Sequence, residues 1–194
     1  MTPAAIRAFI AIELPVSIQD KLGLAIAGLQ ERSPRAVRWV AARNIHLTLK
    51  FLGNVSPDNL TQLTRVIQNE ALRCKPFEFR VGGLGAFPNK IHPRVIWVGI
   101  NAPPALADIQ MGVDRETSRL GYQSEDRGFS AHLTLGRVSQ HATPTEVKQI
   151  AEILAQSAVG DLGAVQVSAL RLYRSDLQTG GAVYTPLFDA RLGK

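Results

Sequence analysis

The sequence predicts a fold of mixed helices and strands in two similar lobes. Two observations lead to this prediction. The tetrapeptide His-Leu-Thr-Leu occurs twice, at residues 46–49 and 132–135, nearly half a chain length apart. Segments with the apolar period of a strand are also interleaved with helical segments, and each half of the chain contains two of the latter. We interpret the repeated motif and the element order as an internal duplication, with an approximate two-fold axis between the lobes.

The first half of the chain contains four predicted strands and two predicted helices. Pro15 opens the first helix, which runs to about residue 31 with apolar residues at helical spacing and ends at Ser33-Pro34. Ser56 caps the second helix, and Pro57 stands in its first turn. The strands are predicted at residues 7–13, 37–40, 45–52 and 77–81.

The second half begins after a glycine-rich stretch at residues 82–85, which we interpret as a strand end or a bulge. Pro103-Pro104 precedes the third helix, which Gly121 ends. Thr143 and Glu146 have the spacing of a capping box at the start of the fourth helix. The strands are predicted at residues 94–100, 130–138, 164–173 and 182–188.

Composition sets limits on the class of protein. The 194 residues are enough for one substantial core, and we expect residues 1–194 to form a single bilobal domain. The formal net charge of +6 weakly favours an anionic partner. Cys74 is the only cysteine, which excludes an internal disulfide. No stretch approaches the roughly 20 apolar residues of a membrane helix, and the first residues lack a long apolar signal region, so we expect a cytoplasmic protein without membrane contact.

Each motif predicts a strand with one apolar face and one face of reactive side chains. Residues i and i+2 of a strand point to the same side. We therefore expect His46, Thr48 and Lys50 on one face, and residues 47, 49 and 51 on the opposite, core face. In the second motif His132 and Thr134 share a face. If the two strands face each other, they bring two imidazoles and two hydroxyls together.

This set of side chains suits acid–base chemistry on a phosphate. Imidazole titrates near neutral pH, so one histidine can act as a base while the other acts as an acid. Opening a cyclic phosphodiester with water requires both, on opposite sides of the phosphorus. Thr48 and Thr134 can each donate a hydroxyl hydrogen to a non-bridging phosphate oxygen. The alternative is that the repeated motif meets a shared structural need.

Three basic residues close to the motifs are candidates for phosphate contacts. Lys50 is expected on the face of His46, while Arg127 and Arg137 flank the second motif. A solvated basic surface is the alternative interpretation. We expect no metal site, because zinc takes three or four ligands and no Asp, Glu or Cys stands at ligand spacing beside either histidine. A nucleoside-triphosphate enzyme is also disfavoured, since the chain lacks the G-x-x-x-x-G-K-[ST] phosphate loop.

Residues 46–53 and 129–137 resemble the paired H-x-T-x signatures of the two-histidine (2H) phosphoesterases. More narrowly, the chain resembles the bacterial and archaeal RNA 2′,3′-cyclic phosphodiesterases, also called 2′-5′ RNA ligases. The likeness runs nearly end to end, and residues 7–12, 93–99 and 181–184 also match that branch. Ala131 departs from the pattern, because proline often precedes the second histidine, but it lies outside the motif.

The resemblance implies an α+β fold in which antiparallel sheets of two pseudo-two-fold-related lobes line a central cleft, with helices outside. It also implies hydrolysis of a terminal RNA 2′,3′-cyclic phosphate to a 2′-phosphomonoester, without metal, ATP or another cofactor. In this reaction His46 would be the proton donor to the 3′ oxygen and His132 the proton acceptor that activates water. The implied partners are RNA with cyclic phosphate ends or small cyclic nucleotides. We expect a monomer, because one chain contains both motifs.

Two other functions are compatible with these residues. The same histidines can run the reverse direction, as an ATP-independent 2′-5′ RNA ligase acting on tRNA halves. A non-catalytic RNA-end-binding protein would instead use Lys and Arg for affinity and stack a base on an exposed aromatic residue. Candidates for that stacking are Phe9, Trp39 and Tyr184, unless they are core residues. The intact His and Thr pairs argue against a relic site.

Overall fold

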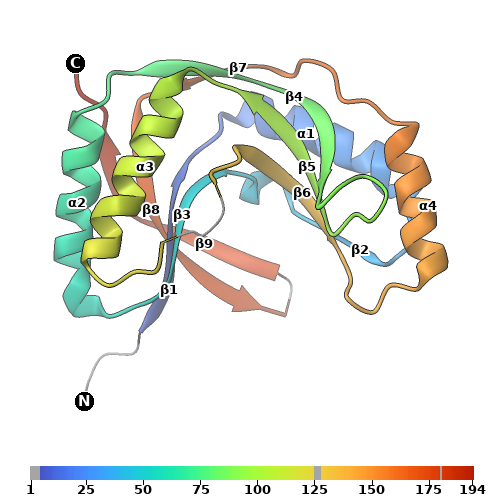
Figure 1. The fold of residues 1–194 in the computed structure, drawn as a ribbon, viewed down its shortest axis with the longest axis horizontal. Coiled ribbons are helices and arrows are strands. Elements are labelled where there is room, and N and C mark those ends of the chain that lie inside the picture. The colour runs from blue at the N-terminus through green and yellow to red at the C-terminus, as the bar shows by residue number, and fades with distance from the viewer. Residues whose placement is uncertain (1–4, 125–127, 180) are drawn as a thin grey trace.

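The computed structural model describes residues 5–124, 128–179 and 181–194, and within them it confirms an α+β fold of two antiparallel sheets and four α-helices (Figure 1). The first sheet has the strand order β3-β1-β8-β9, and the second has the order β2-β6-β5-β4-β7. The strands are β1 Ile6–Ile12, β2 Val37–Trp39, β3 Leu47–Val55, β4 Phe77–Phe87, β5 Val95–Asn101, β6 His132–Val138, β7 Gly163–Val167, β8 Ala169–Gln178 and β9 Gly181–Arg191.

The helices begin and end close to the predicted positions. They are α1 Val16–Gln30, α2 Leu60–Leu72, α3 Pro104–Arg119 and α4 Pro144–Ala155. The capping box of α4 is confirmed, because the Thr143 hydroxyl accepts from the Glu146 N–H while the Glu146 carboxylate accepts from the Thr143 N–H. Gly121 follows α3 with φ +90°, a left-handed conformation that terminates helices.

The two sheets exchange strands between the halves of the chain. β4, from the first half, pairs with β5 in the second sheet, whereas β8, from the second half, pairs with β1 in the first sheet. The helices mix in the same way, since α2 packs against α3, and α3 packs against β3 (Figure 1). Each sheet therefore contains one motif strand, as the duplication predicts, but neither sheet is built from one half of the sequence.

The predicted single strand at residues 164–173 is wrong. It is two strands in different sheets: β7 pairs with β4, and β8 pairs with β1. The break falls at Ser168, where the chain passes from one sheet to the other. Buried residues alternate at Val165 and Val167, then resume at Leu170 and Leu172 with the opposite parity. This change of parity is a sequence signal of the crossing.

The glycine-rich stretch lies inside β4 rather than at its end. The register of β4 against β5 shifts between Gly82 and Leu84, so the predicted bulge is present. Gly83 has φ +81°, a left-handed conformation that a residue with a side chain rarely adopts. β4 continues beyond the bulge to Phe87, whose ring contacts the ring of His132 at the start of β6.

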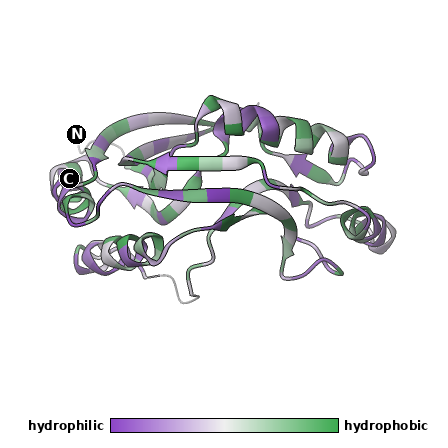
Figure 2. Cartoon of the chain, turned by 90° about the horizontal axis from the view of Figure 1, so that it is seen from above, coloured by the Kyte–Doolittle hydropathy of each residue, from purple (hydrophilic) through white to green (hydrophobic). Residues whose placement is uncertain are grey.

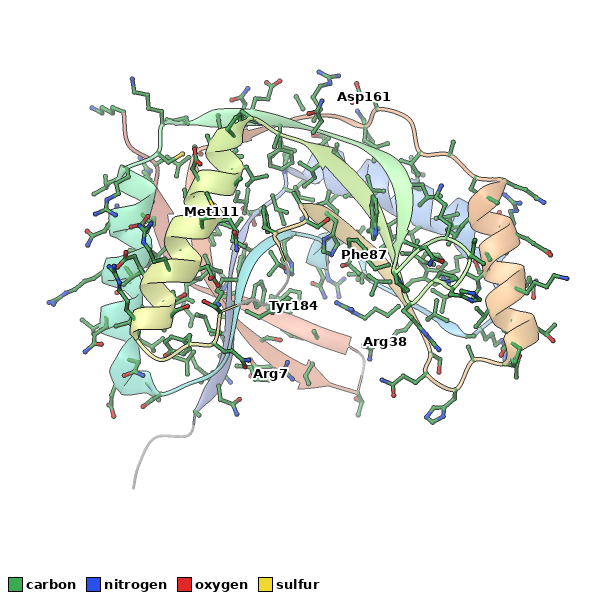
Figure 3. All side chains as sticks on the ribbon, in the orientation of Figure 1. Arg7, Arg38, Phe87, Met111, Asp161 and Tyr184 are labelled. Carbon is green, nitrogen blue, oxygen red and sulfur yellow. The ribbon has the colours of Figure 1, made fainter. Side chains whose placement is uncertain are left out.

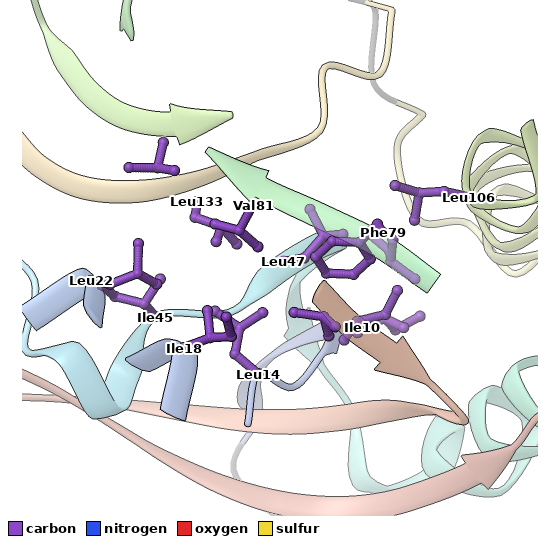
Figure 4. Packing of buried hydrophobic residues seen from close by; sticks show 14 of the residues in the cluster. Ile10, Leu14, Ile18, Leu22, Ile45, Leu47, Phe79, Val81, Leu106 and Leu133 are labelled. Atoms are coloured by element: carbon purple, nitrogen blue, oxygen red, sulfur yellow. The ribbon is translucent and has the colours of Figure 1, made fainter. Parts of the chain in front are cut away.

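One apolar core joins the two sheets. Leu47 of β3 and Leu133 of β6 are both fully buried in it, together with residues from α1, β4 and α3 (Figure 4). Full burial of a leucine side chain contributes roughly 1.5–3 kcal/mol. Figure 2 shows hydrophobic and hydrophilic residues alternating along the strands and helices that surround this core. The leucines of the two motifs thus anchor their strands and leave the other face for the histidines.

Candidate active site

His46 lies between the short 3₁₀ turn Ala42–Asn44 and the first residue of β3. Its Nδ1 is 2.8 Å from the carbonyl oxygen of Asn44. A carbonyl only accepts hydrogen bonds, so Nδ1 must carry a hydrogen and donate it. The ring is thereby held by one nitrogen, and Nε2 is left to exchange a proton with another group.

Aromatic rings enclose the imidazole of His46. Phe9 stacks on it with ring centroids 4.6 Å apart, and Tyr184 meets it edge-on at 5.1 Å. Burial among these rings disfavours the imidazolium and lowers the pKa of His46 from 6.5 to about 4, although the hydrogen bond to Asn44 opposes this shift. His46 is therefore neutral at pH 7 in the ligand-free protein.

His132 repeats this arrangement in the second sheet. It is the first residue of β6, and its Nδ1 is 2.7 Å from the carbonyl oxygen of Ser130. Phe87 meets the ring edge-on at 4.9 Å, and Trp97 lies 6.5 Å away. In both motifs the carbonyl two residues before the histidine fixes Nδ1, so both rings offer Nε2.

The threonines lie two residues after the histidines on the same strands. Thr48 stands opposite Ala11 of β1, and Thr134 stands opposite Trp97 of β5. Both are half-buried. The hydroxyls therefore lie on the same strand faces as the imidazoles, as the alternation predicts.

A β-bulge follows each threonine. The register of β3 against β1 skips Leu49, and the register of β6 against β5 skips Leu135. A bulge inserts one unpaired residue and reverses the side to which later side chains point. The two motifs thus share a backbone irregularity as well as a sequence.

The predicted face of Lys50 is wrong because of this bulge. Lys50 pairs with the buried Ile10, so it points away from the face of Thr48. Its side chain has no exposed surface. Phe51 is reversed in the same way: it was expected in the core, but it is 56% exposed and its ring lies 6.2 Å from Phe9. Lys50 is therefore unable to contact a phosphate at the histidines.

Helix α3 holds the bulge of β3. The Lys50 ammonium lies 2.5 Å from a carboxylate oxygen of Asp114 and also donates to the carbonyl of Gln123. One helical turn earlier, Gln110 donates to the carbonyl of the bulged Leu49 at 3.3 Å. The bulge of the second motif is packed differently. Gly136 occupies the position that corresponds to Lys50, so no buried cation is present there. A Cβ there would lie 2.9 Å from the ring of Trp39, which fills the space.

The remaining predicted residues have different outcomes. Arg137 is exposed and lies opposite Arg38 of β2, on the face of Thr134. Arg127 lies outside the described residues. Phe9 is only 3% exposed, so its predicted role in stacking a base is wrong; it stacks on His46 instead. Tyr184 is half-buried against the same imidazole.

The two sheets approach each other at these residues. β3 and β6 contact each other at a few positions. Burial raises the pKa of Tyr184, which belongs to the first sheet, while the positive charges of Arg137 and Arg38 of the second sheet and of Arg7 of β1 oppose this rise. Figure 3 shows Tyr184 near the centre of the molecule, with Arg7 and Arg38 on either side of it. Tyr184 thus links His46 of the first sheet with the positive charges of the second sheet.

Sequence reasoning missed Arg7, Arg38, Tyr173 and Phe87. Arg7 could have been found, because it stands two residues before Phe9 on a predicted strand and shares its face. Tyr173 stacks on Phe9 with centroids 5.2 Å apart, but only the pairing of β1 with β8 brings it there. Phe87 reaches His132 because β4 extends beyond its predicted end.

A cavity of about 150 Å³ adjoins His46. Its lining includes Asn44, Tyr173 and Tyr184, and it is bordered by the ion pair of Arg171 with Glu13. Among the described residues, no group of three or more His, Cys, Asp and Glu side chains is arranged to hold a metal ion. Within the same residues, no helix is long and apolar enough to cross a membrane.

The sequence matches the LigT-like phosphoesterase family twice, over residues 12–97 and 98–184. It is 32% identical to the RNA 2′,3′-cyclic phosphodiesterase of Methanothermobacter thermautotrophicus over 187 residues, which cover 96% of this chain and 99% of that protein. The Escherichia coli protein of the same name is 28% identical over 93% of both chains. The crystal structure of E. coli LigT complexed with 3′-AMP superposes with a TM-score of 0.77 at 28% identity, covering 98% of this chain and 99% of that one.

Proposed function

This chain belongs to the LigT-like phosphoesterase family, and we propose that it hydrolyses the 2′,3′-cyclic phosphate of RNA ends with His46 and His132 as its proton-transfer pair. One observation carries the residue assignment. Both motifs combine an imidazole fixed at Nδ1 by a carbonyl with a threonine hydroxyl on the same strand face. Two such units on strands in contact can hold one phosphorus between two Nε2 atoms.

The protons then move in opposite directions at the two histidines. Nε2 of His132 accepts a proton from water as the water oxygen attacks phosphorus. The bond from phosphorus to the 3′ oxygen breaks, and Nε2–H of His46 donates its proton to that oxygen. The product is a 2′-phosphomonoester, and the proton is returned to His46 through solvent. Each general acid or base contributes typically about 10²–10⁴-fold.

The threonine hydroxyls stabilise the charge on phosphorus. Thr48 and Thr134 each donate a hydrogen bond to a non-bridging oxygen, where negative charge increases as water attacks. The rings of Phe9 and Tyr184 bury the imidazole of His46, and these apolar surroundings strengthen electrostatic interactions there.

The donor role of His46 requires a proton that the ligand-free protein does not hold at neutral pH, since burial lowers the pKa of this residue to about 4. A bound phosphate anion within hydrogen-bonding distance favours the imidazolium and raises the pKa. His46 therefore takes up its proton together with the substrate.

The test is turnover of a small 2′,3′-cyclic nucleotide, with and without a chelator, followed by identification of the product isomer. We expect the 2′-phosphate in both conditions. We expect His46→Ala and His132→Ala each to lose at least about 100-fold in kcat. The matched control is His92→Ala, which removes an exposed histidine outside the motifs and should retain full activity. Normal turnover by either motif variant would contradict the assignment, and tight binding without turnover would indicate a non-catalytic protein.

A further inference from the structure

Two arginines stand directly opposite each other on neighbouring strands of the second sheet. Arg38 of β2 pairs with Arg137 of β6, and both side chains are exposed. Like charges at directly opposite positions of an antiparallel pair are destabilising. Neither guanidinium has an ion pair or side-chain hydrogen bond within the part of the chain that the structure describes. This arrangement costs stability unless an anion lies between the two groups.

A third arginine comes from the first sheet. Arg7 lies on the face of β1 that carries Phe9, and it is exposed and likewise without an ion-pair partner among the described residues. The positive charges of all three arginines oppose the rise in the pKa of Tyr184 that burial causes. In the view of Figure 3, Arg7 and Arg38 lie below Tyr184, one toward each side.

This arginine cluster, Arg7, Arg38 and Arg137, adjoins both halves of the candidate site. Tyr184, at its centre, meets the ring of His46 edge-on at 5.1 Å. Arg137 lies on the same face of β6 as Thr134, because the bulge at Leu135 restores it to that side. An anion bound between Arg38 and Arg137 therefore lies on the face of β6 that carries Thr134.

We propose that the arginine cluster binds the phosphodiester backbone of the RNA strand upstream of the cyclic phosphate, so that the enzyme prefers an oligonucleotide end to a cyclic mononucleotide. This inference rests on the proposed function. A cyclic mononucleotide has a single phosphate, which the histidines and threonines hold, and it leaves the arginines without a ligand. An RNA strand supplies further phosphates, which guanidinium groups bind through paired N–H donors.

The first measurement compares kcat/KM for a 2′,3′-cyclic mononucleotide and for a tetranucleotide that ends in the same cyclic nucleotide. We expect the tetranucleotide to be preferred at least tenfold at low salt. Contacts to a single-stranded backbone give a log–log salt slope of about −0.7 each. The tetranucleotide should therefore lose kcat/KM with a slope steeper by about 2 than that of the mononucleotide.

The second measurement uses the double variant Arg7→Gln/Arg38→Gln. We expect its ratio of tetranucleotide to mononucleotide kcat/KM to fall about tenfold, and the extra salt slope to shrink to about −0.7, the single remaining contact. The control is Arg65→Gln, which removes one exposed positive charge from α2 and should leave the ratio unchanged. An unchanged ratio in the double variant, or equal kcat/KM for both substrates in the wild type, would overturn the inference. Absence of turnover on both substrates would instead refute the proposed function on which it rests.

Thermal unfolding provides a readout that does not depend on activity. Because Arg38 and Arg137 repel each other, Arg38→Gln should raise Tm by up to about 3 °C in the absence of RNA. A lower Tm would show that the pair is a structural contact and would count against an anion site.

Discussion

His46 shows how one side chain is set for its chemistry by its neighbours. The Asn44 carbonyl selects the hydrogen-bearing nitrogen, and the rings of Phe9 and Tyr184 remove water from the imidazole. The first contact orients the ring, while the second lowers its pKa to about 4. His132 has the same carbonyl contact, so the orientation of both rings is a property of the motif and its two preceding residues.

The low pKa of His46 makes stability depend on pH. The unfolded chain binds a proton at this residue below about pH 6.5, whereas the folded chain binds it only below about pH 4. Between these values the unfolded state holds more protons, so the free energy of unfolding falls as the pH falls from 6.5 to 4. The loss is at most on the order of 3 kcal/mol.

We therefore expect His46→Gln to reduce the dependence of stability on pH across this window, compared with the wild type. Urea unfolding at several pH values between 4 and 7 measures the difference in slope, which is independent of any constant destabilisation by the substitution. Identical slopes for both proteins would contradict a buried neutral imidazole.

Binding of an anion should favour the protonated form of His46, which burial disfavours in the ligand-free protein. If the phosphate meets Nε2 of His46, saturating inorganic phosphate should raise the pKa of this imidazole by about 1–3 units, because an opposite charge within a few ångströms favours the imidazolium. NMR titration of the ring protons measures the shift, and Thr48→Val, which weakens the phosphate site, should reduce it. A pKa that does not move would argue that His46 lacks contact with phosphate and would refute its donor role.

At the scale of the element, the β-bulge of β3 decides which side chains reach the site. Without it, simple alternation would place Lys50 beside His46 and Phe51 in the core. With it, Lys50 is buried against Asp114 of α3, and Gln110 satisfies the carbonyl of the bulged Leu49. Helix α3 therefore supports the active strand through one buried charge and one backbone contact.

Removing one partner of the Lys50–Asp114 ion pair should lower the free energy of unfolding. Lys50→Met leaves the Asp114 carboxylate without its buried cation, and we expect a loss of about 3–5 kcal/mol in the free energy of unfolding. The double variant Lys50→Met/Asp114→Leu should recover most of that loss, because it removes both charges. Denaturant unfolding measures both values.

The matched control for this experiment is Lys148→Met. It breaks the exposed i,i+4 pair of Lys148 with Glu152 and should change stability by less than about 1 kcal/mol. Equal effects of Lys50→Met and Lys148→Met would mean that the buried pair contributes no more than a surface pair.

The whole molecule is a duplicated fold whose halves are interlocked. Two family repeats cover residues 12–97 and 98–184, yet each sheet draws strands from both halves of the chain. The pairing of β4 with β5 and of β8 with β1 joins the repeats through backbone hydrogen bonds and one shared core. The proposed site depends on this arrangement, because it takes one motif from each sheet.

We therefore expect the two repeats to unfold together. Urea titrations followed by circular dichroism and by tryptophan fluorescence should give coincident transitions. A fragment of residues 1–97 should not fold alone, because its β4 would have an unpaired edge and its core would be open. Two separate transitions, or a folded fragment, would contradict the interlocked arrangement.

The sequence by itself determined the local features of this protein. The two motifs, the caps of the helices and the alternation of each strand all depend on residues close together in the chain. They placed Thr48, His132 and Thr134 on strands and His46 at the start of one. They also indicated the duplication. The glycines at residues 82–85 indicated a strand end or a bulge for the same reason, and the structure has a bulge there in which Gly83 adopts a backbone conformation that glycine favours.

Only the tertiary structure decided which residues meet across strands. The bulge after Thr48 moved Lys50 into the core, Phe9 was buried under His46 by the pairing of β1, and Arg38 was set opposite Arg137 by the register of β2 with β6. Strand register and strand exchange arise from contacts between residues far apart in the chain. Periodicity within one segment carries no information on its partner, because alternation is the same whichever strand lies beside it.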